Sequence, residues 1–528
     1  MPGIGTDTEA AGLAGRHVVV AGLGITGQSV IPLLSALDAR VTAVDSRDDP
    51  ERREVAERLA SGDVTVRLGP DAIAAPPAGT DLVVTSPGLR PDTPLLATAA
   101  AAGIEVFGDV ELAWRLRPVL ADGSRQQWLA VTGTNGKTTT VRMLAAMLAA
   151  AGLRSVAAGN VGTPILDVVT DPAPYPVVAV ELSSFQLYWS ATITPLAAVV
   201  LNVAAHHLDW HDDLESYTAA KARIFAPGTI AIFNAEDPRT MAMAAAAQAR
   251  RKVAFRLGPP GADELGVADG WLTDNAFGNA PVPGPVQLAE VAGVSGQAGG
   301  GDEGGRTAIG SGEVAGVSGQ AGGGAEASRT SVRLAEVAAV QPAAPHNVAD
   351  ALAAAALARA YGVASAAVRA GLAAFRPEPH RIALVAEVDG VAFIDDSKAS
   401  NPAAAAASIA AFESIVWLAG GLFRGSDGDL EELVAGAAPR LRGAVLIGTD
   451  RARFGQALAR HAPDVPVTEL ASTDTGVMEE AVARAAAMAR RGDTVLLAPA
   501  AQSWDMFRDY PARGAAFAAA VGRLARPR

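Results

Sequence analysis

The stretch WLAVTGTNGKTTT, residues 128–140, decides the fold of this chain. Its apolar beginning predicts a buried strand, its glycine-rich middle a loop, and the Leu, Met and Ala spacing of residues 141–151 a helix. Backbone N–H groups in such a loop and at the helix start form a concave site for phosphate. Lys137 would reach the outer phosphates of a nucleotide, and the Thr138 hydroxyl would hold Mg²⁺. An ordinary glycine turn is the alternative, because Val131 stands where the longer motif has its first Gly; the flanking strand and helix favour the nucleotide site.

Composition limits the possible functions. A chain of 528 residues predicts about three domains of ~150 residues each. The net charge of −13 argues against a nucleic-acid partner, which needs a basic surface. The chain has no cysteine, so neither disulfides nor thiolate metal sites are possible. Residues 1–15 lack a secretory pattern and no apolar run reaches ~18 residues, which predicts a cytoplasmic protein that does not bind membranes.

A second glycine-rich loop lies near the N-terminus. Residues 16–29, RHVVVAGLGITGQS, predict a strand and a G-x-G-x-x-G turn, with a helix from about 28 to 37. The next strand, residues 41–44, ends at Asp45, where a dinucleotide fold places an acid for a ribose hydroxyl. NAD is one interpretation, the diphosphate of a UDP-sugar is another, and Asp45 could equally be a helix cap or turn acid. A strand over residues 82–85 leads Ser86 and Gly88 to the same sheet edge.

The middle of the chain carries candidate metal ligands. A strand over residues 176–180 ends at Glu181, a natural Mg²⁺ ligand beside a phosphate loop. Three of the seven histidines fall within residues 206–211, after a strand over residues 197–201. Singly each histidine is a cap or packing residue, but clustering at a strand end favours a metal or phosphate site. Lys221 lies on a helix predicted over residues 217–225, where a solvated helix face is the alternative.

Residues 284–340 differ in character from the rest. The run EVAGVSGQAGGG at 290–301 recurs unchanged at 313–324. A glycine-rich duplication with few apolar residues predicts a disordered insertion without chemistry.

The C-terminal part predicts another α/β unit. Strands over residues 392–394, 415–419, 443–447 and 494–497 alternate with helices, which predicts a parallel sheet. Three polar segments, residues 395–402, 420–425 and 498–507, follow strands of that sheet. Open α/β sheets bind ligands at the carboxyl ends of their strands, so convergence of three such segments argues for a site rather than for simple turns.

These motifs resemble the Mur ligases, ATP-dependent amide-forming enzymes of peptidoglycan synthesis. The resemblance is carried by residues 133–138 (GTNGKT), 181–184 (ELSS), 202–207 and 220–221, in that order. The C-terminal segments DSKASN, 396–401, and PAAQSWDMF, 499–507, are similar to the branch that adds D-glutamate. The resemblance covers nearly the whole chain apart from the insertion, and it favours UDP over NAD in the N-terminal domain.

The resemblance implies a set of site residues and two Mg²⁺ ions. Lys137, Glu181, His207 and Lys221 would be catalytic, and Thr138, Glu181, His207 and a carbamylated Lys221 would hold metal. His206 replaces the usual Asp, so either His206 or His207 could be the ligand. ATP would be bound by Gly133, Thr134, Asn135, Gly136, Lys137, Thr138, Thr139, Asn347, Asp350 (near the adenine), Arg381 and Asp396.

The two other substrates have their own implied residues. The UDP substrate would be bound by Gly24, Ile25, Thr26, Asp45, Ser46, Arg47, Ser86, Gly88 and Asn160. D-glutamate would be bound by Lys398, Ser400, Arg424, Ser503 and Tyr510. The family often has Lys at position 424 and Phe at 510; Arg can clamp a carboxylate through two hydrogen bonds, so the exchange would retain function and could alter affinity.

The resulting expectation is an α/β protein of three domains. A Rossmann-like UDP domain would span residues 1–125, a central P-loop ATPase-type domain with a parallel or mixed sheet 126–376, and a Rossmann-like amino-acid domain 377–528. The protein would be a monomer that joins D-glutamate to UDP-N-acetylmuramoyl-L-alanine through an acyl phosphate. A folylpolyglutamate synthase, which lacks such an N-terminal domain, and a non-catalytic nucleotide-binding module are the alternatives.

Overall fold

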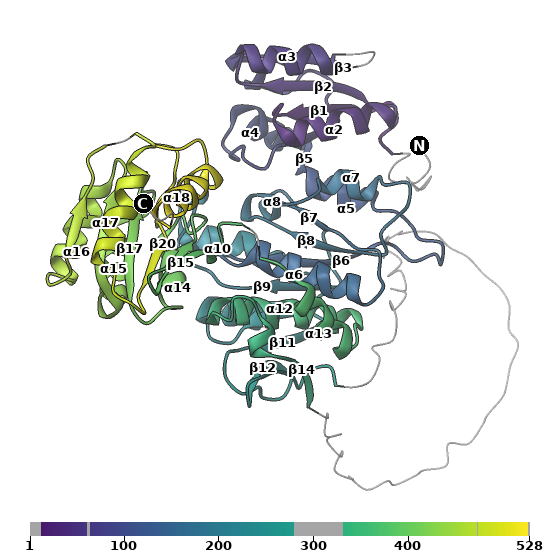
Figure 1. Cartoon of the computed structure of the whole chain (residues 1–528). Coiled ribbons are helices and arrows are strands. Elements are labelled where there is room, and N and C mark those ends of the chain that lie inside the picture. Colours follow the sequence, from purple (N-terminus) through teal and green to yellow (C-terminus); the bar gives the residue numbers. More distant parts are fainter. Residues whose placement is uncertain (1–11, 61–63, 279–330, 378, 473, 526–528) are drawn as a thin grey trace, which may run out of the picture.

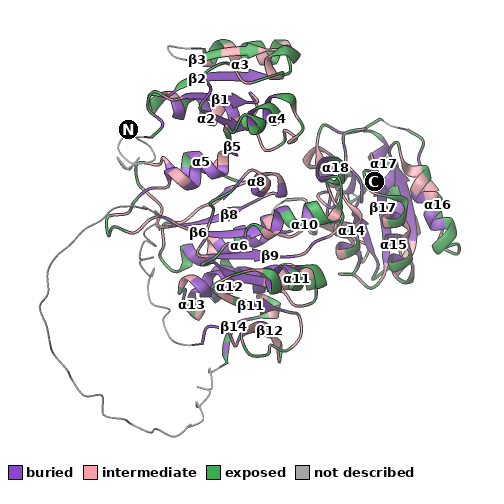
Figure 2. Ribbon diagram, turned by 180° about the vertical axis from the view of Figure 1, so that it is seen from behind, coloured by how far each residue is buried: buried purple, intermediate pink, exposed green. Residues whose placement is uncertain are grey.

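Three sheets, each covered by helices, follow one another along the chain (Figure 1). The computed structural model describes residues 12–60, 64–278, 331–377, 379–472 and 474–525. In each unit the buried strands lie inside and the exposed residues gather on the outer helices (Figure 2). The predicted three-part α/β fold is confirmed. No helix within the described ranges is long and apolar enough to cross a membrane.

The N-terminal sheet has five parallel strands in the order β3-β2-β1-β4-β5. Its strands are β1 (His17–Ala21), β2 (Arg40–Asp45), β3 (Val64–Leu68), β4 (Leu82–Thr85) and β5 (Glu105–Gly108). Its helices are α2 (Ile25–Ala36), α3 (Pro50–Leu59), η1 (Pro70–Ile73), α4 (Pro94–Ala101) and α5 (Asp109–Leu116). Helix α2 begins three residues before the predicted start, because Gly27 lets the helix pack directly on the loop: a Cβ there would lie 2.1 Å from the Gly22 carbonyl oxygen.

The central sheet has nine strands in the order β14-β13-β12-β11-β10-β9-β6-β8-β7. The pairs β12–β13 and β13–β14 are antiparallel and the other pairs are parallel, which confirms a mixed sheet. The strands are β6 (Gln127–Thr132), β7 (Ala157–Gly159), β8 (Val177–Glu181), β9 (Ala197–Val200), β10 (Ile230–Asn234), β11 (Arg251–Phe255), β12 (Glu264–Ala268), β13 (Trp271–Asp274) and β14 (Val332–Glu336).

The central helices cover both faces of that sheet. They are α6 (Lys137–Ala150), α7 (Ile165–Val169), α8 (Ser184–Tyr188), α9 (Leu208–His211), α10 (Leu214–Ala222), α11 (Pro238–Ala246), η2 (Val337–Ala339), α12 (Pro345–Tyr361) and α13 (Ser365–Ala374). Helix α10 begins three residues before its predicted start because Asp213 caps it, accepting a hydrogen bond from the Ser216 N–H at 2.7 Å.

The predicted disordered insertion, residues 284–340, extends too far toward the C-terminus. Residues 331–340 include strand β14, which pairs with β13, and the turn η2. Val332 and Leu334 alternate with exposed residues and are buried in the core, which is the period of a strand. The repeat itself, residues 290–324, lies outside the described residues.

The C-terminal sheet has six strands in the order β15-β16-β20-β17-β18-β19. Its strands are β15 (Ala383–Val388), β16 (Val391–Asp395), β17 (Ile415–Gly420), β18 (Leu441–Ile447), β19 (Val467–Glu469) and β20 (Thr494–Leu497). Its helices are α14 (Pro402–Ile409), α15 (Asp427–Ala437), η3 (Ala438–Arg440), α16 (Arg451–His461), α17 (Val477–Met488) and α18 (Tyr510–Leu524). The expected all-parallel sheet is corrected by β15, an edge strand that pairs antiparallel with β16 through a hairpin turn.

Candidate active site

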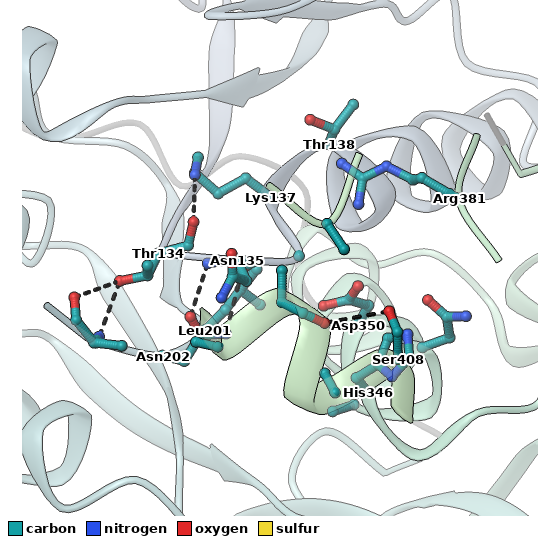
Figure 3. Close-up of a pocket in the computed structure, with 18 of the residues that line it drawn as sticks. Thr134, Asn135, Lys137, Thr138, Leu201, Asn202, His346, Asp350, Arg381 and Ser408 are labelled. Atoms are coloured by element: carbon teal, nitrogen blue, oxygen red, sulfur yellow. Dashed lines mark hydrogen bonds between the residues drawn. The ribbon is translucent and has the colours of Figure 1, made fainter. Parts of the chain in front are cut away.

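A cavity of about 810 Å³ lies where the central and C-terminal domains meet (Figure 3). The central domain contributes the carboxyl ends of β6, β8 and β9 and the start of α12, and the C-terminal domain contributes the ends around β16. The residues that line the cavity include Thr134, Asn135, Gly136, Lys137, Thr138, Asn160, Glu181, Asn202, Asn347, Asp350, Arg381, Asp396, Lys398, Ser408 and Tyr510.

The glycine loop between β6 and α6 has the predicted strand, loop and helix order. Gly133 and Gly136 have φ of +156° and +83°, and a Cβ on Gly136 would lie 2.2 Å from Asp350 Oδ1. Lys137 folds back over the loop, where its Nζ donates to the carbonyl oxygens of Gly133 at 3.1 Å and Thr134 at 2.9 Å. An ammonium and the free N–H groups of the helix start therefore face the same space, as anion binding requires.

Lys221 lies beneath this loop. Only 1% of it is exposed, so the solvated-face interpretation is wrong. Its Nζ donates to the Gly133 carbonyl at 2.8 Å and to Thr132 Oγ1 at 3.3 Å. Burial, followed by the charge of nearby Lys137, holds the pKa of Lys221 well below its usual value; burial also lowers the pKa of Lys137. Two amines in a dry site favour the neutral form of at least one.

Glu181 ends strand β8 beside the loop and is 1% exposed. Its Oε1 accepts a hydrogen bond from Asn160 Nδ2 at 3.0 Å. Its Oε2 is buried and has no hydrogen-bond partner among the described residues. A buried carboxylate oxygen without a donor is costly, and a hard cation satisfies it well. Asn160, expected at the UDP substrate, therefore also orients this carboxylate.

The histidine cluster separates into two kinds of residue. His211 is buried and its Nε2 lies 2.9 Å from Ser184 Oγ, so it packs inside the fold. His206 and His207 lie ring to ring with centroids 3.8 Å apart, and burial lowers the pKa of both, that of His206 to about 3. A neutral imidazole is the metal-binding form. Among the described residues, no three His, Asp or Glu side chains lie close enough together to form a metal site. The predicted ligand set contains only two residues of these types, Glu181 and His207, and it stays a prediction.

Buried carboxylates line the other side of the cavity. Burial raises the pKa of Asp350 to about 7 and that of Asp396 to about 6. Asp350 lies against Gly136, so it faces the phosphate loop, a position that the adenine expectation did not include. The Ser408 hydroxyl donates to Asp396, and Asn347 donates to the Pro342 carbonyl at 3.2 Å. The charge of Arg381 opposes the rise in both carboxyl pKa values, so all three groups share one electrostatic environment.

Three C-terminal loops converge as expected. Backbone hydrogen bonds join Ala500 to Ala399 and Leu422 to Gln502, each at 2.9 Å. Lys398 lies over the Tyr510 ring at 5.4 Å, and both line the cavity. Ser400, Arg424 and Ser503 stand on the same loops but do not line it.

Two residues absent from the predicted site hold it together. Arg513, buried in α18, donates to Ser397 Oγ at 3.0 Å, to the Ser397 carbonyl at 2.8 Å and to the Ala501 carbonyl at 3.0 Å. Asn202 accepts from the Asn135 N–H at 2.9 Å and donates to the Asn135 carbonyl at 3.2 Å. Asn202 stands at a strand end in the run that leads to the histidines, which was the available signal; Arg513 had none, because it acts across 116 residues of sequence.

The N-terminal loop forms a separate site. Asp45 is 8% exposed and accepts hydrogen bonds from the N–H groups of Leu23 at 2.8 Å and Arg47 at 2.9 Å, so it holds the loop in shape. A Cβ on Gly22 would lie 2.4 Å from Ser86 Oγ, which brings the two predicted UDP segments together. Ile25 is 80% exposed at the start of α2. Gly24 and Thr26 lie in the loop after β1 and the first turn of α2, Ser46 follows β2, and Gly88 follows β4; none of them lines the large cavity.

Comparison with known proteins decides the family. Three family descriptions match in order: "Mur ligase MurD-like, N-terminal domain" over residues 16–108, "Mur ligase middle domain" over 131–264, and "Mur ligase, glutamate ligase domain" over 380–501. A Thermobifida fusca protein named UDP-N-acetylmuramoylalanine–D-glutamate ligase is 52% identical over 97% of this chain and 99% of its own. The chain belongs to the Mur ligase family.

Other relatives agree with that assignment. A Streptomyces coelicolor Mur ligase with the same name is 50% identical over 97% of this chain and 98% of its own. A pseudomurein peptide ligase type C from Methanothermus fervidus shares the fold, with a TM-score of 0.53 and 16% identity over 96% of this chain and 100% of its own.

Proposed function

We propose that this chain joins D-glutamate to UDP-N-acetylmuramoyl-L-alanine at the expense of ATP, a step of peptidoglycan synthesis. The observation that carries the proposal is the cavity, where the phosphate loop with Lys137 and the buried Glu181, whose Oε2 has no hydrogen-bond partner among the described residues, face the loops of the glutamate-ligase domain. The names of relatives at 50–52% identity support the same reaction.

The reaction proceeds through an acyl phosphate. The carboxylate of the UDP substrate attacks the γ-phosphorus of ATP, the bond to the bridging oxygen breaks, and ADP leaves. The amine of D-glutamate then attacks the acyl carbon, inorganic phosphate leaves, and the amine loses a proton as the amide forms. Lys137 and the N–H groups of the phosphate loop stabilise the charge that develops on the transferred phosphoryl group. No residue of the chain becomes covalently attached to substrate.

The proposal includes two Mg²⁺ ions. Thr138 would hold the ion bound to the nucleotide, and Glu181, His207 and Lys221 would hold the other. The ions would neutralise phosphate charge and orient the attacking carboxylate. The unpartnered Glu181 Oε2 supports this assignment. His206 stands beside His207 and is the alternative ligand.

Lys221 would act as a carbamate. A carbamate forms when a neutral amine attacks CO₂ and loses a proton, and burial lowers the pKa of Lys221 well below its usual value, which favours the neutral amine. The modification turns a buried cation beside Lys137 into an anion, which removes a like-charge pair and supplies oxygen ligands.

The remaining ligands bind at the two flanking domains. The UDP group would lie on the loops of Gly24, Asp45 and Ser86, and D-glutamate on those of Lys398, Ser400 and Ser503. Arg424 and Tyr510 complete the D-glutamate set, and Ile25, Thr26, Ser46, Arg47, Gly88 and Asn160 the UDP set. Thr139 joins the ATP set already described.

The proposed function also concerns the location and oligomeric state of the enzyme. We place the enzyme in the cytoplasm as a monomer without nucleic-acid partners.

We assign domain limits at residues 1–125, 126–376 and 377–528. The sheets span residues 17–108, 127–336 and 383–497, which is compatible with those limits.

The test is phosphate release from ATP in the presence of UDP-N-acetylmuramoyl-L-alanine. D-glutamate is compared with L-glutamate and L-alanine, and each is also tested without the UDP substrate. We expect release with D-glutamate and the UDP substrate together. Equal release with the other amino acids would contradict the assigned acceptor and favour another amide ligase of this superfamily. No release under any condition, with ATP still bound, would favour a non-catalytic nucleotide-binding module.

A further inference from the structure

The turn that carries His207 is conformationally unusual. Helix α9 is a single turn, Leu208–His211, and residues at both of its ends have positive φ: +56° at His207 and +68° at Asp212. A non-glycine residue keeps such a conformation when its surroundings hold it there. What contacts this turn therefore determines where the His207 side chain stands.

The central domain supplies one set of contacts. His211 Nε2 lies 2.9 Å from Ser184 Oγ, and the Phe185 ring lies 4.8 Å from the His207 ring and 5.5 Å from the His211 ring. These contacts hold the inner side of the turn against helix α8.

The N-terminal domain supplies the other set, through Arg90. Its Nη1 donates to the carbonyl oxygens of Asp209 at 2.5 Å and Trp210 at 3.0 Å, and its Nη2 lies 2.9 Å from Asp212 Oδ1. The Trp210 Nε1 donates back to the Gly88 carbonyl at 3.0 Å. The residues joined are about 120 positions apart in the sequence, so this is a contact between domains.

The same N-terminal segment carries the proposed UDP site. Ser86 and Gly88 belong to that site, and Arg90 follows two residues later. A ligand that orders residues 86–88 would also order the arginine that grips the turn. We infer that Arg90 is a positioning residue that links binding of the UDP substrate to the placement of His207.

This inference rests on the proposed function for the role of His207, but the contacts of Arg90 with the turn do not depend on that function. The pairs of Arg90 with Asp92 and Asp212 are exposed, with 70% and 77% of the carboxyl side chains accessible, and such ion pairs contribute little. The two hydrogen bonds from Arg90 to backbone carbonyls therefore hold the turn. The planar guanidinium donates to several acceptors at once, and an ammonium cannot do so in the same geometry.

The experiment compares Arg90→Ala, Arg90→Lys and Arg53→Ala in the full chain. Arg53 is an exposed arginine of the same domain whose partner Asp48 lies on the same surface, so its removal is the matched control. Amide hydrogen exchange is measured in a peptide spanning residues 205–216, with and without UDP-N-acetylmuramoyl-L-alanine. Steady-state rates, with the Mg²⁺ dependence, are measured on the same samples.

We expect exchange in that peptide to be about tenfold faster in Arg90→Ala than in the native chain. The UDP substrate should slow exchange there in the native chain and in Arg53→Ala, and not in Arg90→Ala. The kcat of Arg90→Ala should fall about tenfold, with KM for the UDP substrate within about threefold and a higher Mg²⁺ requirement. The exchange rate and kcat of Arg90→Lys should lie between those of the native chain and those of Arg90→Ala. If Arg90→Ala does not fold, Arg90→Lys tests the inference.

Native-like exchange in both Arg90 variants would overturn the inference. So would unchanged exchange with a raised KM alone, because Arg90 would then bind the UDP substrate directly. The exchange comparison without substrate needs no turnover, so it tests the grip even if the proposed reaction is wrong.

Discussion

Two glycine-rich loops of this chain, residues 22–27 and 133–136, have the same order of strand, loop and helix but different surroundings. Around the first loop, the carboxylate of Asp45 is occupied by two backbone N–H groups, and the apolar side chain of Ile25 is exposed. Around the second, Lys137 and Lys221 lie within the site and one oxygen of Glu181 is buried without a partner. A loop whose polar groups are already hydrogen-bonded can bind a ligand without reacting with it. Charged groups without hydrogen-bond partners can instead stabilise the charge that develops during a reaction.

The neighbouring strands make this difference. Strand β4 brings Ser86 beside the first loop, and β8 brings Glu181 beside the second. The backbone supplies N–H groups in both places, but the buried carboxylate at the first loop is hydrogen-bonded to that loop, whereas the second loop adjoins Lys137, the buried Lys221 and a carboxylate oxygen without a hydrogen-bond partner among the described residues. A glycine loop by itself therefore indicates phosphate binding, and the side chains that the neighbouring strand supplies decide whether the site can also be catalytic.

The largest effect should come from the second loop. Lys137→Ala should reduce kcat about 10³-fold, because it removes the ammonium that we propose stabilises the transferred phosphoryl group. Lys252→Ala, at an exposed lysine whose Nζ donates to the Ala245 carbonyl, should leave kcat unchanged. Phosphate-release kinetics measure both, and a Lys137→Ala loss below tenfold would place the chemistry elsewhere.

Glu181→Gln should lower kcat about 10²-fold and raise the Mg²⁺ concentration needed for half-maximal rate. The amide keeps the shape of the side chain but loses the negative charge, including that on Oε2, which is buried without a hydrogen-bond partner among the described residues. Glu215→Gln, at an exposed site on α10, is the control. A titration with Mg²⁺ at saturating substrates measures the effect; an unchanged Mg²⁺ requirement would show that Glu181 is structural.

Asp350→Asn should change how stability depends on pH. Burial raises the pKa of Asp350 to about 7, so between about pH 4 and pH 7 the folded state holds a proton that the unfolded state has lost. The free energy of unfolding of the native chain therefore falls as pH rises through this range. The asparagine cannot ionise, so the variant should be more stable at pH 8, on the order of 2 kcal/mol. Urea unfolding at pH 5 and pH 8 measures the slopes, and identical slopes would contradict the shift.

The first loop should respond in KM rather than in kcat. Asp45→Asn loses one of the two acceptor oxygens that hold Leu23 and Arg47, so the loop loosens. We expect KM for the UDP substrate to rise about tenfold with kcat within about twofold. Asp71→Asn, at an exposed residue of η1 in the same domain, is the matched control. A fall in kcat without a rise in KM would contradict the assignment of the first loop to binding and of the second loop to chemistry.

The smallest effect should come from Ile25→Ala. Ile25 is 80% exposed, so its loss should not change the melting temperature, whereas KM for the UDP substrate should rise about threefold through lost apolar contact. Leu384→Ala, at a residue 64% exposed on β15, should change neither quantity. Thermal melting and steady-state kinetics measure the pair, and equal effects of both substitutions would remove Ile25 from the UDP site.

Local signals account for most of the fold and for much of the site. Glycine spacing marked both loops, and residues at strand ends marked Glu181 and the histidines, because these features depend on a few neighbouring positions. Helix starts were misplaced by three residues at α2 and α10, where a packing glycine and the cap of Asp213 decide the boundary. Edge strands β15 and β14 were missed or misassigned, because pairing with a neighbour rather than a strong local pattern makes them strands.

The sequence by itself determined the order of three α/β units, the phosphate loop and the residue types available for chemistry. The tertiary structure alone decided that Lys221 is buried, that one oxygen of Glu181 has no partner, and that Asp45 is occupied by its own loop. It also decided the grip of Arg90 on the turn of His207. The physical reason is that a motif depends on residues close along the chain, whereas burial and hydrogen-bond satisfaction depend on groups that folding brings together from distant positions.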